Sequence, residues 1–201
     1  YHQFARNTLQ LNNQNETYSE IGRFAGVDNT DWSWGAIIFD MDQDGYKDIF
    51  VANGIYKDLL DRDYLEFYAN PRNVRSVFEE SDEGIIGLID KMPSVKIPNY
   101  AFVNKQDLSF SNHAKTLGLD EPSFSNGATY ADLDNDGDLD LVVNNINMPP
   151  FIYQNTAESR VANHKITVIL EGDAKNKYAI GSKVRLFTNS GVLYQELVPI
   201  R

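Results

Sequence analysis

The stretch AIIFDMDQDGYKDIFVAN (residues 36–53) holds a nine-residue acidic loop between two apolar segments, and ATYADLDNDGDLDLVVNN (128–145) repeats this arrangement. The two central segments, DMDQDGYKD (40–48) and DLDNDGDLD (132–140), are here called the first and second acidic loops; both follow the pattern D-x-D-x-D-G-x-x-D. The flanking segments are short and apolar, and each pair is joined by a turn that contains Gly. This pattern predicts a strand–loop–strand hairpin in both places.

The two acidic loops lie 92 residues apart, and the same offset aligns much of the chain around them. The alignment needs no gap from Asn7 to Asn53. Identical or similar residues meet at Asn7/Asn99, Asn12/Asn104, Tyr18/Phe110, Gly26/Gly118, Gly35–Ala36/Gly127–Ala128, Val51/Val143 and Asn53/Asn145. Self-similarity over this length indicates a repeat architecture, in which each unit buries its apolar face against a neighbour.

Further short apolar segments, YAFVN (100–104) and FIYQN (151–155), are also predicted to be strands. Many short β segments at such spacing favour a sandwich, a barrel or a propeller. The fold class is therefore predicted to be mainly β.

Residues 55–98 break the repeat, because their apolar residues recur at helical spacing. A first helix is predicted within KDLLDRDYLEFYA (57–69), a second starts at Pro71 with Asn70 as its N-cap, and a third lies in GIIGLIDKM (84–92). This insertion is either a lid or binding element, or a structural plug that covers exposed strands. Since amphipathic faces usually pack into a core, the plug is favoured.

The C-terminal part has its own β pattern. KITVILEG (165–172) alternates apolar and polar residues and predicts a strand, and SKVRLFT (182–188) and VLYQELV (192–198) flank Asn189–Ser190–Gly191, a good hairpin turn. We expect a separate β module that is unfinished at Arg201. Because the chain starts with Tyr1 rather than Met, it is expected to be a fragment of a longer protein. The predicted division is 1–54 (first repeat), 55–98 (helical insertion), 99–160 (second repeat) and 161–201 (β module).

Composition restricts the classes of function. The 201 residues are 42% hydrophobic and 12% aromatic, enough for a real core, and no apolar run approaches the roughly 20 residues of a membrane span. The formal net charge of −11 argues against a nucleic-acid partner, which needs a basic surface. Cysteine is absent, which excludes disulfides and thiolate metal sites.

The spacing of the acidic residues predicts two calcium sites. Oxygen ligands at alternate positions of a tight loop converge on one point, and hard oxygens without sulfur or imidazole select Ca²⁺ or Mg²⁺. Calcium is favoured because its six to eight flexible ligands can all come from such a loop. The predicted ligands are the side chains of Asp40, Asp42, Asp44 and Asp48 with the backbone carbonyl of Tyr46, and the side chains of Asp132, Asp134, Asp136 and Asp140 with the carbonyl of Asp138.

Other interpretations of these loops fit the sequence less well. An EF-hand needs Glu at loop position twelve and flanking helices, but Val51 and Val143 stand there between predicted strands. A solvated acidic turn would be reasonable for one copy but not for two in a matched repeat. A catalytic pair needs carboxylates in contrasting environments, whereas four that converge describe a cation cage. No nucleophile or nucleotide-binding motif is present.

The motifs resemble a known family. DMDQDGYKDIFVANG and NGATYADLDNDGDLDLVVNN are similar to FG-GAP/VCBS repeats, the calcium-binding units also found in integrin-α-type β-propellers. LQLNNQNETYSEIGRFAGV and AFVNKQDLSFSNHAKTLGL match the family's usual run-up to the loop. NHKITVILEGDAKNKYAIGSKVRLFTNSG resembles the start of an ASPIC/UnbV domain, which follows such repeats in secreted bacterial proteins and in cartilage acidic protein-like proteins. The helical insertion lies outside the resemblance.

The resemblance implies propeller blades with calcium in the loops between adjacent strands, here in an open or partial propeller because only two loops are present. It implies an extracellular, periplasmic or outer-surface location, further blades from the full-length chain, and an adhesion or recognition role toward a protein or carbohydrate ligand. Trp32, Trp34 and Tyr130 are candidates for stacking on sugars, although buried packing is favoured for them. The alternatives are a propeller-hosted, metal-dependent lyase or hydrolase and a purely structural spacer.

Overall fold

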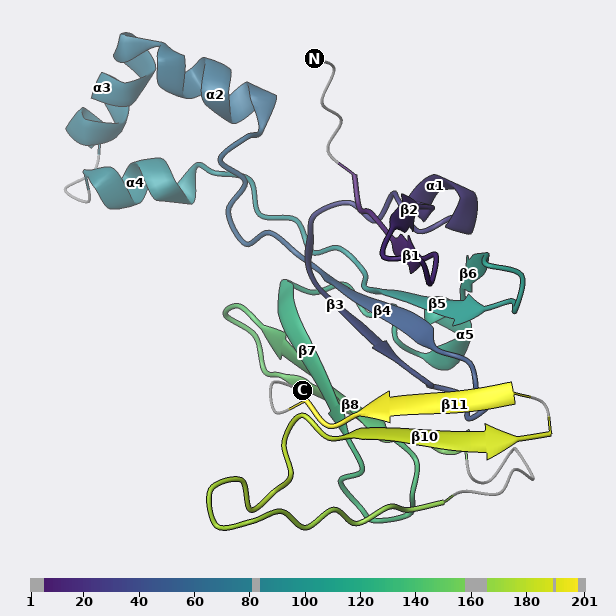
Figure 1. The fold of residues 1–201 in the computed structure, drawn as a ribbon. Coiled ribbons are helices and arrows are strands. Elements are labelled where there is room, and N and C mark those ends of the chain that lie inside the picture. The colour runs from purple at the N-terminus through teal and green to yellow at the C-terminus, as the bar shows by residue number, and fades with distance from the viewer. Residues whose placement is uncertain (1–5, 81–83, 158–165, 190, 199–201) are drawn as a thin grey trace.

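The computed structural model describes residues 6–80, 84–157, 166–189 and 191–198. These residues form several small antiparallel sheets with a few short helices, so the prediction of a mainly β protein is confirmed (Figure 1). They do not form a closed propeller. Two sheets make up the centre of the molecule, and two hairpins and a helical arm lie around them.

Each acidic loop joins two strands of a central sheet, as predicted. The first sheet has the order β3-β4-β5-β6, with β3 (Ser33–Phe39) and β4 (Asp48–Asn53) on either side of the first loop. β5 (Tyr100–Asn104) and β6 (Phe110–Asn112) complete it. The second sheet has the order β7-β8-β9, formed by β7 (Ser125–Ala131), β8 (Asp140–Asn145) and β9 (Phe151–Tyr153).

The two sheets reproduce the 92-residue offset in their hydrogen-bonded register. Phe39 pairs with Asp48 in the first sheet, and Ala131 pairs with Asp140 in the second. Both β3 and β7 carry a register irregularity at the matching position, between Ser33 and Gly35 and between Ser125 and Gly127. A bulge of this kind bends a strand and is a designed feature rather than a defect. The repeat in sequence is therefore a repeat in structure.

The main core lies between the two sheets. Ile37, Phe39 and Phe50 of the first sheet pack with Leu141 and Val143 of the second. All six residues of β4 are buried, which marks it as a central strand that is covered on both faces. Its other face meets a second cluster. This cluster contains the strand residues Ile49, Val51 and Phe102 together with Leu9, Ile21, Ala25 and Val27 of the N-terminal segment.

This N-terminal segment folds as a small hairpin followed by one helical turn: β1 (Gln10–Asn12), β2 (Tyr18–Glu20) and α1 (Gly22–Ala25). Strand β6 is followed in the same way by α5 (Ala114–Leu117). Both helices end at a glycine in the left-handed conformation, Gly26 at φ 76° and Gly118 at φ 72°. That conformation favours glycine at the end of a helix, which explains why the repeat keeps Gly at this position.

The insertion contains the three predicted helices, α2 (Arg62–Ala69), α3 (Pro71–Glu80) and α4 (Ile85–Asp90). The first begins five residues after the predicted start, because Asp61 is its N-cap and accepts a hydrogen bond from the Tyr64 amide at 2.8 Å. Asn70 caps the second as predicted, since its Oδ1 accepts a hydrogen bond from the Arg72 amide at 3.0 Å.

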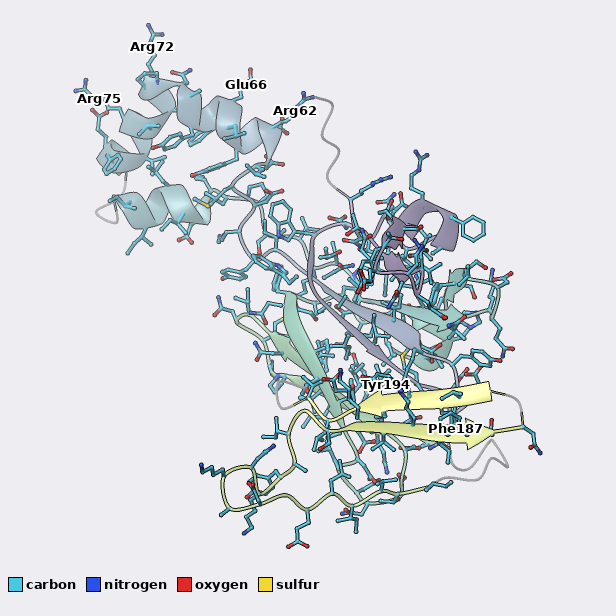
Figure 2. All side chains as sticks on the ribbon, viewed as in Figure 1. Arg62, Glu66, Arg72, Arg75, Phe187 and Tyr194 are labelled. Carbon is cyan, nitrogen blue, oxygen red and sulfur yellow. The ribbon has the colours of Figure 1, made fainter. Side chains whose placement is uncertain are left out.

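The favoured plug role of the insertion is wrong for the part that the structure describes. The helices pack on one another and project from the sheets as an arm, which a bridge between Ile55 and Val95 closes at its base. Figure 2 shows Arg62, Glu66, Arg72 and Arg75 on the outside of this arm. Buried Tyr64, Val77 and Leu88 form its own small interior, so the amphipathic faces pack against each other instead of on strands.

The C-terminal hairpin is confirmed as β10 (Lys183–Thr188) and β11 (Gly191–Glu196), which pair antiparallel across the predicted turn. Ser190 of that turn lies outside the described residues. The strand predicted at 165–172 is wrong: Lys165 is not described, and residues 166–172 form no strand. A period-two pattern becomes a strand only beside a pairing partner, and here Ile169 is 90% exposed. Figure 2 places Phe187 and Tyr194 on the hairpin, where both are exposed.

Candidate metal centres

The acidic loops have the same backbone conformation. Gln43 and Asn135 occupy the left-handed region at φ 59° and 64°, and Gly45 and Gly137 follow at φ 90° and 91°. Glycine adopts this conformation without strain, and it allows the sharp bend that turns the loop back on itself. As a result the Gly45 amide donates to Asp40 Oδ2 at 3.0 Å, and the Gly137 amide donates to Asp132 Oδ2 at 3.1 Å.

The first loop brings Asp40, Asp42 and Asp48 together, with one carboxylate oxygen from each within 4.8 Å of the others. A calcium ion holds its ligands at about 2.4 Å, so two ligands on opposite sides of the ion lie up to about 4.8 Å apart. The three oxygens therefore have the spacing of a cation site. Asp44 is not in this triad; its Oδ2 accepts a hydrogen bond from Gln106 Nε2 at 3.3 Å.

The second loop brings Asp132, Asp134 and Asp136 together at the same spacing. Gln154 Nε2 donates to Asp134 Oδ2 at 2.6 Å. Asp140, the counterpart of Asp48, lies outside this triad. Both triads offer only hard oxygen ligands and can hold metal ions of the Ca²⁺ or Mg²⁺ type.

The last aspartate of each loop also ties the loop to its surroundings. Asp48 Oδ2 accepts from the Met41 amide at 2.9 Å, and its Oδ1 accepts from the Asn104 amide at 2.9 Å. Asp140 repeats both contacts, from the Leu133 amide at 2.9 Å and the Asn155 amide at 2.8 Å. Both carboxylates are almost completely buried. Each therefore closes its loop and joins it to the neighbouring strand.

The two loops are in contact with each other. Gln43 Nε2 donates to the carbonyl of Gly137 at 3.3 Å. The side-chain amide of Asn155 donates to Met41 of the first loop at 2.9 Å and to Leu139 of the second at 3.2 Å, in both cases to the backbone carbonyl. The centres therefore belong to one continuous hydrogen-bonded edge of the two sheets.

The electrostatics of the first centre favour a bound cation. Burial raises the pKa of Asp40 and of Asp42 above the usual value, and repulsion from Asp44 raises both further. Burial raises the pKa of Asp48 to about 6, even though the Asn104 and Met41 amides oppose the shift. A cation among these groups would remove the cost of holding the charges together.

The second centre shows the same tendency at one residue. The Asp138 backbone N–H lowers the pKa of Asp136, but desolvation and repulsion from Asp138 and Asp134 outweigh it and raise the pKa overall. Repulsion between neighbouring carboxylates is thus common to both centres.

Of the ten predicted ligands, six lie in the two triads. The side chains of the remaining four either make other contacts or are exposed to solvent. Asp44 and Asp140 are engaged as described above. Tyr46 is exposed, and the Asp138 side chain is buried and accepts from the Ala157 amide at 3.0 Å. Ligation through the carbonyls of Tyr46 and Asp138 stays a prediction.

The candidate sugar-stacking aromatics do not share one environment. Tyr130 stacks on Phe39, with ring centroids 4.7 Å apart, which confirms packing for this residue. Trp34 is 54% exposed, so the expectation of burial is wrong for it. Trp32 and Trp34 lie with ring centroids 6.5 Å apart.

Sequence reasoning missed four residues that hold the loops: Asn104, Gln106, Gln154 and Asn155. A signal for two of them was present, because Asn12 aligns with Asn104 at the repeat offset and Asn155 ends a similar segment, FIYQN. The same Asn oxygens also start the next turn: Asn104 Oδ1 accepts from the Gln106 amide at 2.8 Å, and Asn155 Oδ1 accepts from the Ala157 amide at 3.1 Å.

Comparison with models of known protein families finds no match, and comparison with curated proteins finds no similar one. Among the helices of the described residues, none has the length and apolar character needed to cross a membrane.

Proposed function

We propose that this chain is a calcium-stabilised segment of a secreted or cell-surface protein, built from FG-GAP/VCBS-type propeller blades in an open or partial propeller. The observation that carries the proposal is the pair of aspartate triads on loops with the same two left-handed positions, at matching places of two adjoining sheets. A chance acidic turn has no reason to recur with the same φ angles and the same hydrogen bonds.

The donor set favours calcium over magnesium. Each loop offers several carboxylates and backbone carbonyls, which suits an ion with six to eight ligands in flexible geometry. Mg²⁺ keeps several of its waters and prefers octahedral geometry, so it needs fewer protein ligands. In the complete sites, the ten residues predicted from the sequence would act together, with Asp44 joining the first triad and Asp140 joining the second on the ion.

The bound ions would act as structural staples. Gln43 and Asn155 link the first loop to the second, so an ion that fixes one loop restricts the position of the other. The chain has no cysteine for disulfides, and metal staples are an alternative means of stabilising a small-core domain.

On this scaffold we propose an adhesion or recognition role toward a protein or carbohydrate ligand, outside the cytoplasm, with further blades from the full-length chain and an ASPIC/UnbV-like module at residues 161–201. The net charge of −11 disfavours nucleic acid. Of the three candidate aromatics, Trp34 is the one that is exposed and free to contact a sugar with its ring face. No observation favours the lyase or hydrolase alternative.

Chelation tests the calcium proposal. Each occupied site stabilises the native state by about 2.7 kcal/mol when free calcium is 100 times Kd. Removing calcium with a chelator should therefore lower Tm and protease resistance, and calcium but not an equal concentration of magnesium should restore them. The control variant Glu66→Gln loses an exposed acid on the arm, outside both loops, and should show the same fall in Tm on chelation as the wild-type protein. Unchanged Tm and proteolysis after chelation would refute the proposal.

A further inference from the structure

The described residues contain three copies of one short strand, here called the companion strand: β1, β5 and β9. Each copy leads to an asparagine, namely Asn12, Asn104 and Asn155, whose side-chain oxygen accepts a hydrogen bond from the amide two residues later. β1 and β5 correspond at the repeat offset of 92 residues, and β5 and β9 correspond in their pairing with β4 and β8.

Two of the companion strands pair with a hairpin that carries an acidic loop. Phe102 of β5 lies opposite Ile49 of β4, and Tyr153 of β9 lies opposite Leu141 of β8. At the end of each pairing, the backbone N–H of the asparagine donates to the last aspartate of the acidic loop, as described above for Asp48 and Asp140. The companion strand thus recognises both the edge of the hairpin and its loop.

The third companion strand, β1, has this edge open. β1 pairs with β2 on one side, and among the described residues no strand pairs with its other side. The Leu9 carbonyl accepts a hydrogen bond from the Ile21 amide, and the Asn13 amide donates one to the Thr17 carbonyl. The backbone N–H and C=O groups of the odd-numbered residues therefore point toward β2. Because antiparallel strands alternate, the amides of Thr8, Gln10 and Asn12 point to the open side.

The surface beside this edge is apolar and hollow. A cavity of about 270 Å³ there is lined by Leu9, Val27, Trp34, Ile38 and Val51, among others. Ile38 is 49% exposed. Its counterpart at the repeat offset is Tyr130, which is covered by Phe39 from the neighbouring acidic hairpin. Phe39 of the first sheet thus covers Tyr130 of the second sheet, whereas Ile38, the equivalent residue of the first sheet, is left half exposed.

We propose that the open edge of β1 and this cavity dock an antiparallel hairpin with an acidic loop, equivalent to β3–β4, supplied by a polypeptide segment outside the described residues. Its second strand would pair with Thr8–Asn12, and the last aspartate of its loop would accept a hydrogen bond from the Asn12 amide. Its first strand would cover Ile38 as Phe39 covers Tyr130. Both interactions use backbone, carboxylate and apolar groups, so the proposal does not depend on calcium binding.

A second copy of this chain fits the edge less well. Its two acidic hairpins already pair with companion strands, β4 with β5 and β8 with β9. It could offer one only after opening its own sheet, at the cost of those hydrogen bonds. A free hairpin of the same kind has no such cost.

Hydrogen exchange on a fusion protein tests the proposal. A further copy of residues 33–53 is joined by a flexible Gly/Ser linker to the N-terminus of the 201-residue chain, which gives the hairpin a high effective concentration. We expect the amides of Gln10 and Asn12 to exchange at least about tenfold more slowly than in the unfused chain, as amides do when they enter a stable ladder. Equal exchange rates in the two proteins would overturn the proposal.

Two variants show whether the protection comes from the proposed contacts. Gln10→Pro removes an amide on the open side, where proline is tolerated, and should abolish the protection of Asn12 with little effect on the unfused chain. Replacing the last loop aspartate of the added hairpin with alanine should also remove most of the protection of the Asn12 amide. Protection that survives both changes contradicts the assigned geometry. The unfused chain could instead self-associate, protect these amides, and lose this association in the Gln10→Pro variant. That result would show that a second copy of the chain occupies the edge and would overturn the assignment.

Discussion

The two acidic loops share a backbone but gather different carboxylates. Both have a left-handed residue at position four, a left-handed glycine at position six, and a last aspartate that closes the loop. The first triad nevertheless contains that last aspartate, Asp48, whereas the second contains Asp136 in its place. The two loops therefore share a local conformation but differ in which carboxylates lie together, even though Asp48 and Asp140 accept equivalent hydrogen bonds.

The donors that differ are outside the loops. Gln106 reaches Asp44 in the first loop, whereas Gln154 reaches Asp134 in the second. Neither contact changes the loop backbone. A cation with six to eight ligands would outweigh such single hydrogen bonds and bring the two centres to the same arrangement. The following changes test which features are truly common to both loops.

The largest effect is expected from removing the last aspartate of either loop. Asp48→Ala and Asp140→Ala each leave two backbone amides without their acceptor in a buried place, at about 1–3 kcal/mol per group. Each variant should lose about 3–4 kcal/mol of unfolding free energy in urea titrations with chelator present. Asp42→Ala is the control and should lose far less. If one of the two aspartates proves dispensable, the loops are not equivalent in structure.

The next effect is a pH dependence from the first loop. Because the native pKa of Asp48 is raised to about 6, the native state favours the protonated form, and the stability from this group is lost as pH rises from about 4 to about 6. The loss is at most about 3 kcal/mol, since one pKa unit corresponds to about 1.4 kcal/mol. Urea unfolding at a series of pH values in chelator should show it.

Calcium should reduce this pH dependence, because a bound cation stabilises the carboxylate form. Asp48→Asn should reduce it as well, since the variant has no group that titrates in this range. A stability that rises between pH 4 and 6 in the chelated wild-type protein, and does so equally in Asp48→Asn, would contradict the electrostatic account of the first loop.

A smaller difference is expected between the two asparagines that hold the loops. Both variants lose the hydrogen bond that the asparagine Oδ1 accepts from the amide two residues later. In addition, Asn155→Ala loses bonds from Nδ2 to Met41 and Leu139, one in each loop, whereas Asn104→Ala loses one bond from Nδ2, to Lys47 of the first loop. At about 1 kcal/mol per hydrogen bond, Asn155→Ala should cost about 1 kcal/mol more than Asn104→Ala. Equal thermal unfolding curves for the two variants would show that Asn155 does not couple the loops.

The sequence predicts the strands beside the acidic loops well, because β-branched and aromatic segments with a Gly turn between them leave few alternatives. The 92-residue offset also predicts that the two loops are equivalent. It does not reveal that the first sheet combines strands from both repeats, since β4 of the first repeat pairs with β5 of the second and pairing between repeats leaves no mark on local periodicity.

Two failures have the same physical cause. Residues 166–172 have a strand pattern but no partner strand, and the helices of the insertion have amphipathic faces that pack on each other rather than on a sheet. A pattern shows that a segment has an apolar face, and only the tertiary structure decides what covers it. The triads show the same limit, because Gln106 and Gln154 approach the loops from the residues that follow β5 and β9 and carry no motif of their own.

The most direct test of the central claim is the number of calcium ions bound, measured by isothermal titration calorimetry after complete removal of metal. The account predicts two ions per chain, one of them lost in Asp40→Asn, the other in Asp132→Asn, and both in the double variant. Circular dichroism of each variant would confirm that its fold is kept. No calcium binding by the wild-type chain, or two ions still bound by the double variant, would contradict the account.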